Sequence, residues 1–369
     1  MTIDFTKLAV EGVQGLRAYQ PGKPIDELAR EFNLNEADIV KLASNENPLG
    51  PSDKALEAIR NELSDLTRYP DGNGFELKKA LTEKLGVNAD QLTLGNGSSD
   101  ILEFIVKCFV SKGDDVIVSQ HAFAIYGLVT KMVGGSIIQV PAKNWGHDLP
   151  EMVKSITEKT KIIFVTNPNN PTGTWNTKSE LESFLQQVPE HVIVLLDEAY
   201  FEYVEEAEYP SGIDYLSKYP NLVVTRTFSK AYGLASLRVG YGVSSPELAD
   251  LMNRVRPPFN VDSFALAAAV ASVRDEAYVR QSKELNDEGM RQLQSGFEQL
   301  NLSWIPSVGN FICVEVPGNA MEVYQGLLEV GVIVRPVANY EMPNHLRVSI
   351  GTQKENQVFL LKLKELLDK

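Results

Sequence analysis

The chain has 369 residues, of which 43% are apolar and 23% charged, and this composition is typical of a globular protein with a large core and room for two domains. Its 35 Lys and Arg residues are outnumbered by 49 Asp and Glu residues, which gives a formal net charge of −14. This acidic balance argues against a nucleic-acid partner or an anionic membrane surface, since both bind basic faces, whereas a few local arginines can still capture small anions.

The middle of the chain alternates short apolar runs with helical patterns. Runs at 115–118, 137–140, 162–165, 192–196 and 222–224 are typical of strands buried on both faces, and segments such as 100–110 and 178–187 are typical of helices. This alternation predicts an α/β fold with a mostly parallel central sheet. Ligands in such sheets bind beyond the carboxyl ends of the strands.

The pattern changes after Pro257 and Pro258. A long helical stretch is predicted over 263–300, followed by short strand-like pieces at 311–314, 332–334 and 346–350 and a last helix at 354–367. We predict a large domain over 45–262 and a smaller α+β domain over 263–369. The N-terminal segment, 1–44, is expected to join the smaller domain.

A glycine- and serine-rich turn, Gly95-Asn96-Gly97-Ser98-Ser99-Asp100, precedes the apolar helix predicted at 101–110. Glycines permit tight turns, and serines at a helix start leave backbone N–H groups facing an anion. A plain Ser/Asp helix cap would have the same sequence. The turn is not a P-loop, because the Gly-Lys-Ser/Thr ending is missing.

Lys230 is the most informative residue of the chain. It follows the apolar run 222–224, and the neighbouring run 192–196 ends in Asp197-Glu198-Ala199-Tyr200. A lysine, an aspartate and a tyrosine at the ends of neighbouring buried strands suit a pyridoxal phosphate (PLP) site. Lys230 would form the covalent link to the cofactor, and Asp197 would keep the ring nitrogen protonated, so that the ring draws electrons. Each residue alone has a plainer interpretation, as a solvated lysine, a cap or a packing tyrosine.

Two neighbouring segments fit the same interpretation. The loop Thr166-Asn167-Pro168-Asn169-Asn170-Pro171-Thr172-Gly173 follows a predicted strand, and turn chemistry alone would explain its composition. In the functional interpretation, one Asn side chain and Tyr200 donate to the cofactor's phenolic oxygen, which stabilises the phenolate. Ser229 and Arg238, on either side of Lys230 in sequence, would both reach a phosphate.

The sequence also bears on the compartment. The N-terminus, MTIDFTKLAV, lacks a basic stretch followed by an apolar core, and the longest nearly apolar run, 264–273, is too short to span a bilayer. Cys108 and Cys313 lie in apolar runs with neither a disulfide framework nor a metal-type spacing, so we expect them to pack in the core. We therefore expect a cytoplasmic protein without a metal site.

With these motifs in view, the chain resembles the fold-type I, class-II aminotransferases, which use PLP. Residues 227–242 are similar to the lysine motif of these enzymes, and Pro168–Gly173 and Asp197–Tyr200 match them as well. The resemblance narrows to the histidinol-phosphate aminotransferases and extends from about Tyr19 to the last helix. The segments that carry it are KLASNENP at 41–48, RYP at 68–70, GNGS at 95–98, RPPFNV at 256–261 and LRVSIG at 346–351.

The resemblance implies roles for individual residues. Lys230 carries the cofactor and later acts as general acid and base, Asp197 pairs with the ring nitrogen, and Asn170 and Tyr200 bind the phenolic oxygen. The other implied roles are phosphate binding by Ser98, Ser99, Ser229 and Arg238, completed by Tyr69 from the second subunit of a homodimer; ring stacking by Phe123; and binding of the substrate's anionic group by Tyr19, Arg335 and Arg347.

The implied reaction converts L-histidinol phosphate and 2-oxoglutarate into imidazole acetol phosphate and L-glutamate, a step of L-histidine biosynthesis. Arg335 and Arg347 suit both substrates, because a guanidinium binds either a phosphate or a carboxylate. One alternative is an aminotransferase for aromatic amino acids, and another is a phospho-amino-acid decarboxylase of the same fold, which would release CO₂ and need no oxo acid. A third is a PLP-binding sensor without turnover, but residues 1–40 are too short and insufficiently basic for the DNA-binding segment that such modules usually carry.

Overall fold

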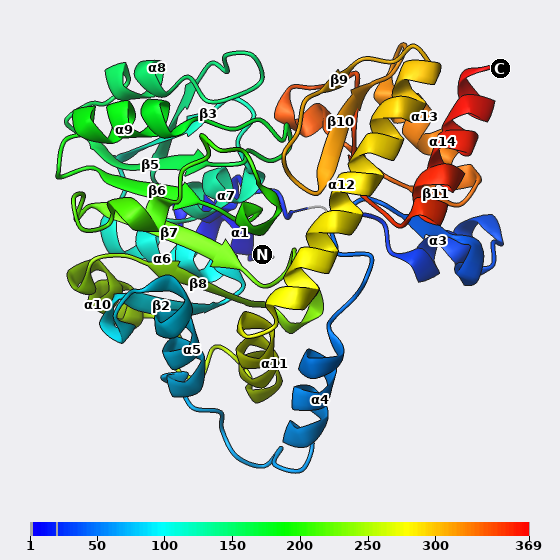
Figure 1. The fold of residues 1–369 in the computed structure, drawn as a ribbon. Coiled ribbons are helices and arrows are strands. Elements are labelled where there is room, and N and C mark those ends of the chain that lie inside the picture. Colours follow the sequence, from blue (N-terminus) through cyan, green and yellow to red (C-terminus); the bar gives the residue numbers. More distant parts are fainter. Residues whose placement is uncertain (1–2, 20, 369) are drawn as a thin grey trace.

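The computed structural model describes residues 3–19 and 21–368, which form a larger and a smaller body of sheet and helices (Figure 1). The larger body contains a seven-stranded sheet, and the smaller one contains most of the C-terminal third of the chain. The long helix α12 (Glu276–Gln299) runs from one body to the other. No helix in these two ranges is long and apolar enough to cross a membrane.

The large sheet has the strand order β2-β8-β7-β6-β5-β3-β4. β8 is antiparallel to both of its neighbours, β2 and β7, and the other adjacent pairs of this sheet are parallel. The predicted α/β fold with a mostly parallel central sheet is therefore confirmed. The strands are β2 (Leu92–Asn96), β3 (Asp115–Ser119), β4 (Ser136–Val140), β5 (Thr160–Thr166), β6 (Ile193–Asp197), β7 (Leu222–Thr227) and β8 (Val239–Val243).

Two edge-side strands, β2 and β8, were not predicted from the sequence. Glycines interrupt the apolar pattern of β8, because α6 (Ser98–Phe109) packs directly on it. A Cβ atom on Gly240 would lie 2.4 Å from the backbone nitrogen of Ser98, and one on Gly242 would lie 2.8 Å from Ile101 Cγ2. The glycines therefore bring the start of α6 close to the sheet.

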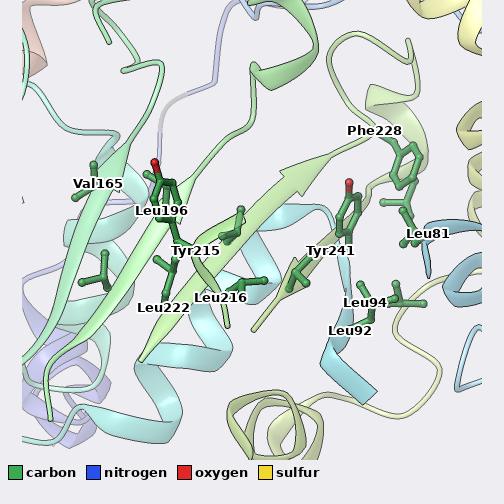
Figure 2. Close-up of a cluster of buried hydrophobic side chains, with 14 of the residues drawn as sticks. Leu81, Leu92, Leu94, Val165, Leu196, Tyr215, Leu216, Leu222, Phe228 and Tyr241 are labelled. Carbon is green, nitrogen blue, oxygen red and sulfur yellow. The ribbon is translucent and has the colours of Figure 1, made fainter. Parts of the chain in front are cut away.

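Helices cover both faces of the sheet, so its strands are buried on both sides as their continuous apolar runs predict. On one face, α6, α7 and α10 pack against alternate strand residues such as Phe164 and Leu195. On the other, residues of α4, α5, α8, α9 and α11 belong to one core cluster with Val165 and Leu196, which Figure 2 draws in part. These helices are α4 (Asp53–Glu62), α5 (Phe75–Leu85), α6 (Ser98–Phe109), α7 (Ala124–Met132), α8 (Leu149–Lys154), α9 (Lys178–Gln187), α10 (Pro246–Val255) and α11 (Ser263–Val273).

The smaller body contains a four-stranded sheet, β12-β13-β10-β9, and a two-stranded parallel pair of β1 with β11. Its helices α13 and α14 pack with α12 around a separate core. The strands are β1 (Val40–Lys41), β9 (Trp304–Ile305), β10 (Phe311–Glu315), β11 (Val332–Ile333), β12 (Arg335–Pro336) and β13 (His345–Ser349), and the helices are α13 (Ala320–Glu329) and α14 (Gln353–Leu367).

The long helical stretch predicted over 263–300 is two helices, α11 and α12, separated at Arg274 and Asp275. Helix α11 contacts α4 and α5, and its buried alanines belong to the core of the large sheet. We therefore propose that the small domain begins with α12 rather than at residue 263.

The N-terminal segment contacts both bodies. Helix α3 (Ile25–Phe32) shares a small core with Leu328 and Ile333, and β1 pairs with β11, so this part lies with the smaller body. Helices α1 (Phe5–Leu8) and α2 (Glu11–Gln14) come first in the chain, and α2 contacts α7 of the larger body. The segment thus passes over the junction of the two bodies.

Candidate active site

A pocket lies at the carboxyl ends of β5, β6 and β7, where the two bodies and the N-terminal segment meet. The structure brings together in its wall every candidate site residue of the sequence analysis except Tyr69. These are Tyr19, Ser98, Ser99, Phe123, Asn170, Asp197, Tyr200, Ser229, Lys230, Arg238, Arg335 and Arg347.

Asp197 lies at the end of β6, between the two neighbouring strands of the sheet. The register pairs it with Thr166 on β5 and Thr225 on β7, so the three side chains point to the same face. Thr225 Oγ1 donates to Asp197 Oδ1 at 3.1 Å, and Tyr126 Oη donates to Oδ2 at 2.8 Å. Burial raises the pKa of the Asp197 carboxyl, and these hydroxyl donors oppose that rise by stabilising the anion.

Lys230 lies three residues beyond the end of β7. Its Nζ donates to the Ser44 carbonyl at 3.0 Å and lies 5.8 Å from the centre of the Tyr200 ring. Burial lowers the pKa of Lys230 to about 7, and the positive charges of Arg347 and Arg238 act in the same direction. A large fraction of the amine is therefore neutral near pH 7, as a nucleophile and a proton acceptor must be.

The Tyr200 hydroxyl is held by two amides. Asn45 Nδ2 donates to Tyr200 Oη at 2.9 Å, and Asn170 Nδ2 donates to the same oxygen at 3.0 Å. The Tyr200 hydroxyl can therefore donate its own proton to a group in the pocket. Burial raises the pKa of Tyr200 to about 12, which keeps that proton in place at neutral pH. Sequence analysis missed Asn45, although it is buried at the centre of the KLASNENP segment and has a left-handed φ of 54°.

An anion site is formed where α6 begins. Ser98 and Ser99 occupy its first turn after Gly97, which has a φ of 77°. A Cβ atom on Gly97 would lie 2.4 Å from Arg238 Nη2, so the glycine lets the guanidinium reach the helix start. Arg238 Nη1 donates to Ser229 Oγ at 3.1 Å. A helix N-terminus, three serine hydroxyls and a guanidinium are the donor set that binds a phosphate.

Arg347, on β13, supplies a second positive group on the side of the smaller body. It is only 7% exposed, and its Nη atoms donate to Asn170 Oδ1 at 2.6 Å and to the Ala43 carbonyl at 2.7 Å. Both acceptors are neutral, and Nε has no hydrogen-bond partner in the described part of the chain. Arg335 lies nearby, with its guanidinium 5.7 Å from the centre of the Tyr19 ring.

Tyr69 lies apart from these residues within one chain. It is 81% exposed in the segment between α4 and α5, and its ring stacks on Phe259 with centroids 4.7 Å apart. The residues around it form a different surface hollow, which does not include Lys230. A role for Tyr69 at a cofactor phosphate therefore requires a second copy of the chain.

The fold and this constellation of lysine, aspartate and phosphate-binding residues define a class of enzyme, and comparison with known proteins identifies it. The model of the family "Aminotransferase class I and II" matches residues 37–363, and the chain belongs to that family. Within it, the chain belongs with the histidinol-phosphate aminotransferases. It is 59% identical to histidinol-phosphate aminotransferase 2 of Pseudomonas fluorescens Pf-5, over 100% of this chain and 99% of the relative. It is likewise 59% identical to histidinol-phosphate aminotransferase 2 of Pseudomonas aeruginosa, over 99% of each chain.

Solved structures agree with this assignment. Histidinol-phosphate aminotransferase from Sinorhizobium meliloti, solved in complex with pyridoxal 5′-phosphate, superposes with a TM-score of 0.90 at 27% identity and 97% coverage of both chains. An aspartate aminotransferase variant from Thermus thermophilus shares the fold, with a TM-score of 0.85 at 24% identity over 96% of this chain and 98% of that one.

PLP is the cofactor of this enzyme, and the residues present fit it. Asp197, held by its hydroxyl donors, would face the ring nitrogen, Tyr200 and Asn170 would face the phenolic oxygen, and the start of α6 with Arg238 would face the phosphate. The near-neutral pKa of Lys230 suits the covalent link. When bound, the cofactor supplies an electron-withdrawing ring that stabilises negative charge at the substrate's α-carbon.

The lowered pKa of Lys230 predicts a pH-dependent stability difference in the cofactor-free protein. Because burial disfavours the charged amine, Lys230 destabilises the folded state most at and below pH 7, and the penalty fades as the pH rises toward 10.5. Lys230→Met should therefore raise the free energy of unfolding at pH 7, and the gain should shrink by pH 10. Denaturant unfolding at both pH values measures this, and a gain that does not depend on pH would contradict it.

Proposed function

We propose that the protein transfers the amino group of L-histidinol phosphate to 2-oxoglutarate, giving imidazole acetol phosphate and L-glutamate in L-histidine biosynthesis. The observation that carries the proposal is Arg347, a buried guanidinium in the wall of the pocket that also contains the Lys230 amine. Its hydrogen-bond acceptors among the described residues, Asn170 Oδ1 and the Ala43 carbonyl, are neutral. A phosphate or carboxylate of a substrate would give this guanidinium a negatively charged partner. The 59% identity to named histidinol-phosphate aminotransferases supports L-histidinol phosphate as the amino donor.

We assign a role in this reaction to individual side chains of the pocket. Arg347 and Arg335, with Tyr19 beside them, bind the anionic end of either substrate and so place its α-carbon near Lys230. With PLP bound, Lys230 Nζ would accept the proton from that carbon and would donate it back at C4′ of the cofactor. Asp197 would hold the proton on the ring nitrogen, and Tyr200 would donate to the phenolic oxygen. Phe123 would pack against the ring face, and Ser98, Ser99, Ser229 and Arg238 would hold the phosphate.

A panel of amino donors tests the substrate assignment. Initial rates with 2-oxoglutarate should give a kcat/KM for L-histidinol phosphate well above those for phenylalanine and tyrosine. Threonine phosphate should release no CO₂. A higher kcat/KM for the aromatic amino acids, or CO₂ release without an oxo acid, would assign the protein to one of the other functions of this fold.

The proposal includes a cytoplasmic homodimer in which Tyr69 binds the cofactor phosphate of the partner subunit. It is supported by the 81% exposure of Tyr69 and by the exposed apolar side chains Leu66, Phe75 and Phe259 in the same region. A surface of this kind is typical of an interface between subunits.

Subunit mixing tests the contribution in trans. Tyr69→Phe should weaken PLP binding, and Lys230→Ala should abolish turnover. In a hybrid of the two variants, one site keeps both native residues only if Tyr69 acts across the interface. At a PLP concentration too low to activate the Tyr69→Phe parent, unfolding and refolding an equal mixture should then restore about a quarter of wild-type activity. Activity no higher than the mean of the two parents would mean that Tyr69 acts within its own chain.

A further inference from the structure

Tyr126 is a buried side chain that none of the steps above uses. It lies on α7 against the face of the sheet that carries Asp197, and it is completely inaccessible to solvent. Its ring stacks on Phe164, with centroids 4.4 Å apart and planes inclined by 6°. Phe123, one helical turn earlier, meets the Tyr126 ring edge-on at 5.8 Å. This packing leaves the hydroxyl little freedom to move.

The hydrogen bonds of Tyr126 have a fixed direction. Its hydroxyl lies 2.8 Å from Asp197 Oδ2, and an ionised carboxylate only accepts, so the phenolic proton is donated there. Thr166 Oγ1 lies 2.7 Å from the same phenolic oxygen and must be the donor in that contact. The hydroxyls thus form a one-way chain from Thr166 through Tyr126 to Asp197, in which each bond polarises the next.

We propose that Tyr126 is a positioning residue that keeps Asp197 charged and aimed at the ring nitrogen of PLP. Thr225 serves the other carboxylate oxygen in the same way, at the longer distance of 3.1 Å. The inference deepens the proposed function, but the group that it concerns is the cofactor and not the substrate. If Phe replaces Tyr126, Asp197 Oδ2 loses its hydroxyl donor and faces an apolar side chain in a buried site. The neutral form of the Asp197 carboxyl is then favoured, and the ring nitrogen of PLP loses its ionic partner.

A cofactor analogue separates this role from a merely structural one. The affinity of the cofactor-free protein is measured for PLP and for the analogue that has a C–H group in place of the ring nitrogen, in the wild type and in Tyr126→Phe. Loss of a hydrogen bond to a charged group should lower the affinity of the variant for PLP by about 10- to 100-fold. Affinity for the analogue should not fall, because the analogue offers no nitrogen to Asp197. With PLP bound, kcat should fall while KM for the amino donor stays the same.

Two further variants keep the test decisive. Tyr215→Phe removes a buried hydroxyl outside the pocket that contains Lys230, and it should bind both ligands as the wild type does. Thr225→Val should also lower the affinity for PLP and leave the affinity for the analogue unchanged, with a smaller loss than Tyr126→Phe. It replaces Tyr126→Phe if that variant does not fold. An equal loss for PLP and the analogue, or no loss for either, would overturn the inference. Because neither ligand is a substrate, failure with L-histidinol phosphate would leave this result standing.

Discussion

Lys230→Ala is expected to lower kcat for transamination by about 10⁴-fold or more, because we propose that the same amine forms the covalent link and moves the proton. Its nitrogen lies within a pocket that also contains Asp197 and Tyr200, and its pKa of about 7 suits both tasks. Steady-state kinetics with L-histidinol phosphate and 2-oxoglutarate measure the loss. PLP should still bind to the variant through the phosphate site at the start of α6.

A chemical label identifies the lysine directly. Borohydride reduction of the PLP-loaded wild type should fix the cofactor to the peptide that contains Lys230, and Lys230→Ala should retain no covalent cofactor. Lys178→Ala, which removes an exposed lysine at the start of α9, is the matched control and should behave as the wild type. Substantial turnover by Lys230→Ala, or a label on another lysine, would refute the assignment.

Arg347→Ala is expected to lower kcat/KM for both L-histidinol phosphate and 2-oxoglutarate, each by about 10²- to 10³-fold, because we propose that this one buried guanidinium binds the phosphate and the carboxylate alike. Its contacts with Asn170 and Ala43 pre-orient it, since they hold the Nη atoms in place before substrate arrives. Separate kinetics with each substrate varied measure the two losses.

Controls separate binding from folding in this variant. Arg347→Lys keeps the charge and loses the planar fork, and its loss should be intermediate for both substrates. Arg254→Ala, which removes a surface arginine paired with Asp250, should change neither value. A melting temperature near that of the wild type shows that the Ala variant is folded. If only one of the two substrates is affected, the shared anchor is wrong, and Arg335 becomes the better candidate for the other substrate.

The sequence predicted the central sheet well because its inner strands are unusually regular. The runs at 162–165 and 192–196 are continuous and apolar, and both were found as β5 and β6 within a few residues of the predicted ends. The strand β8 was missed because its glycines are required by the close approach of α6, and a glycine-rich run does not resemble a strand. The break between α11 and α12 was missed because an Arg-Asp pair is compatible with a continuing helix.

The site was predicted from residues to which we assign contacts with the cofactor or substrate, and the residues that hold those side chains in place were missed. Tyr126 lies three residues after Phe123 and therefore on the same side of α7. This spacing is a weak signal that Tyr126 lies near the pocket, because the sequence does not show which side of the helix faces Asp197. Asn45 comes from a segment 155 residues away from its partner Tyr200. The sequence gives no measure of such long-range contacts, because they depend on how the N-terminal segment passes over the junction of the two bodies.

The most direct test of the account is the visible absorption spectrum of the PLP-loaded protein before and after addition of L-histidinol phosphate without an oxo acid. The account predicts a yellow band of lysine-bound cofactor at the start, its loss on addition of the substrate, and appearance of the amine form of the cofactor. A band that persists would mean that the amine donor is another compound. Absence of the band at the outset would contradict the role of Lys230 and with it the site as a whole.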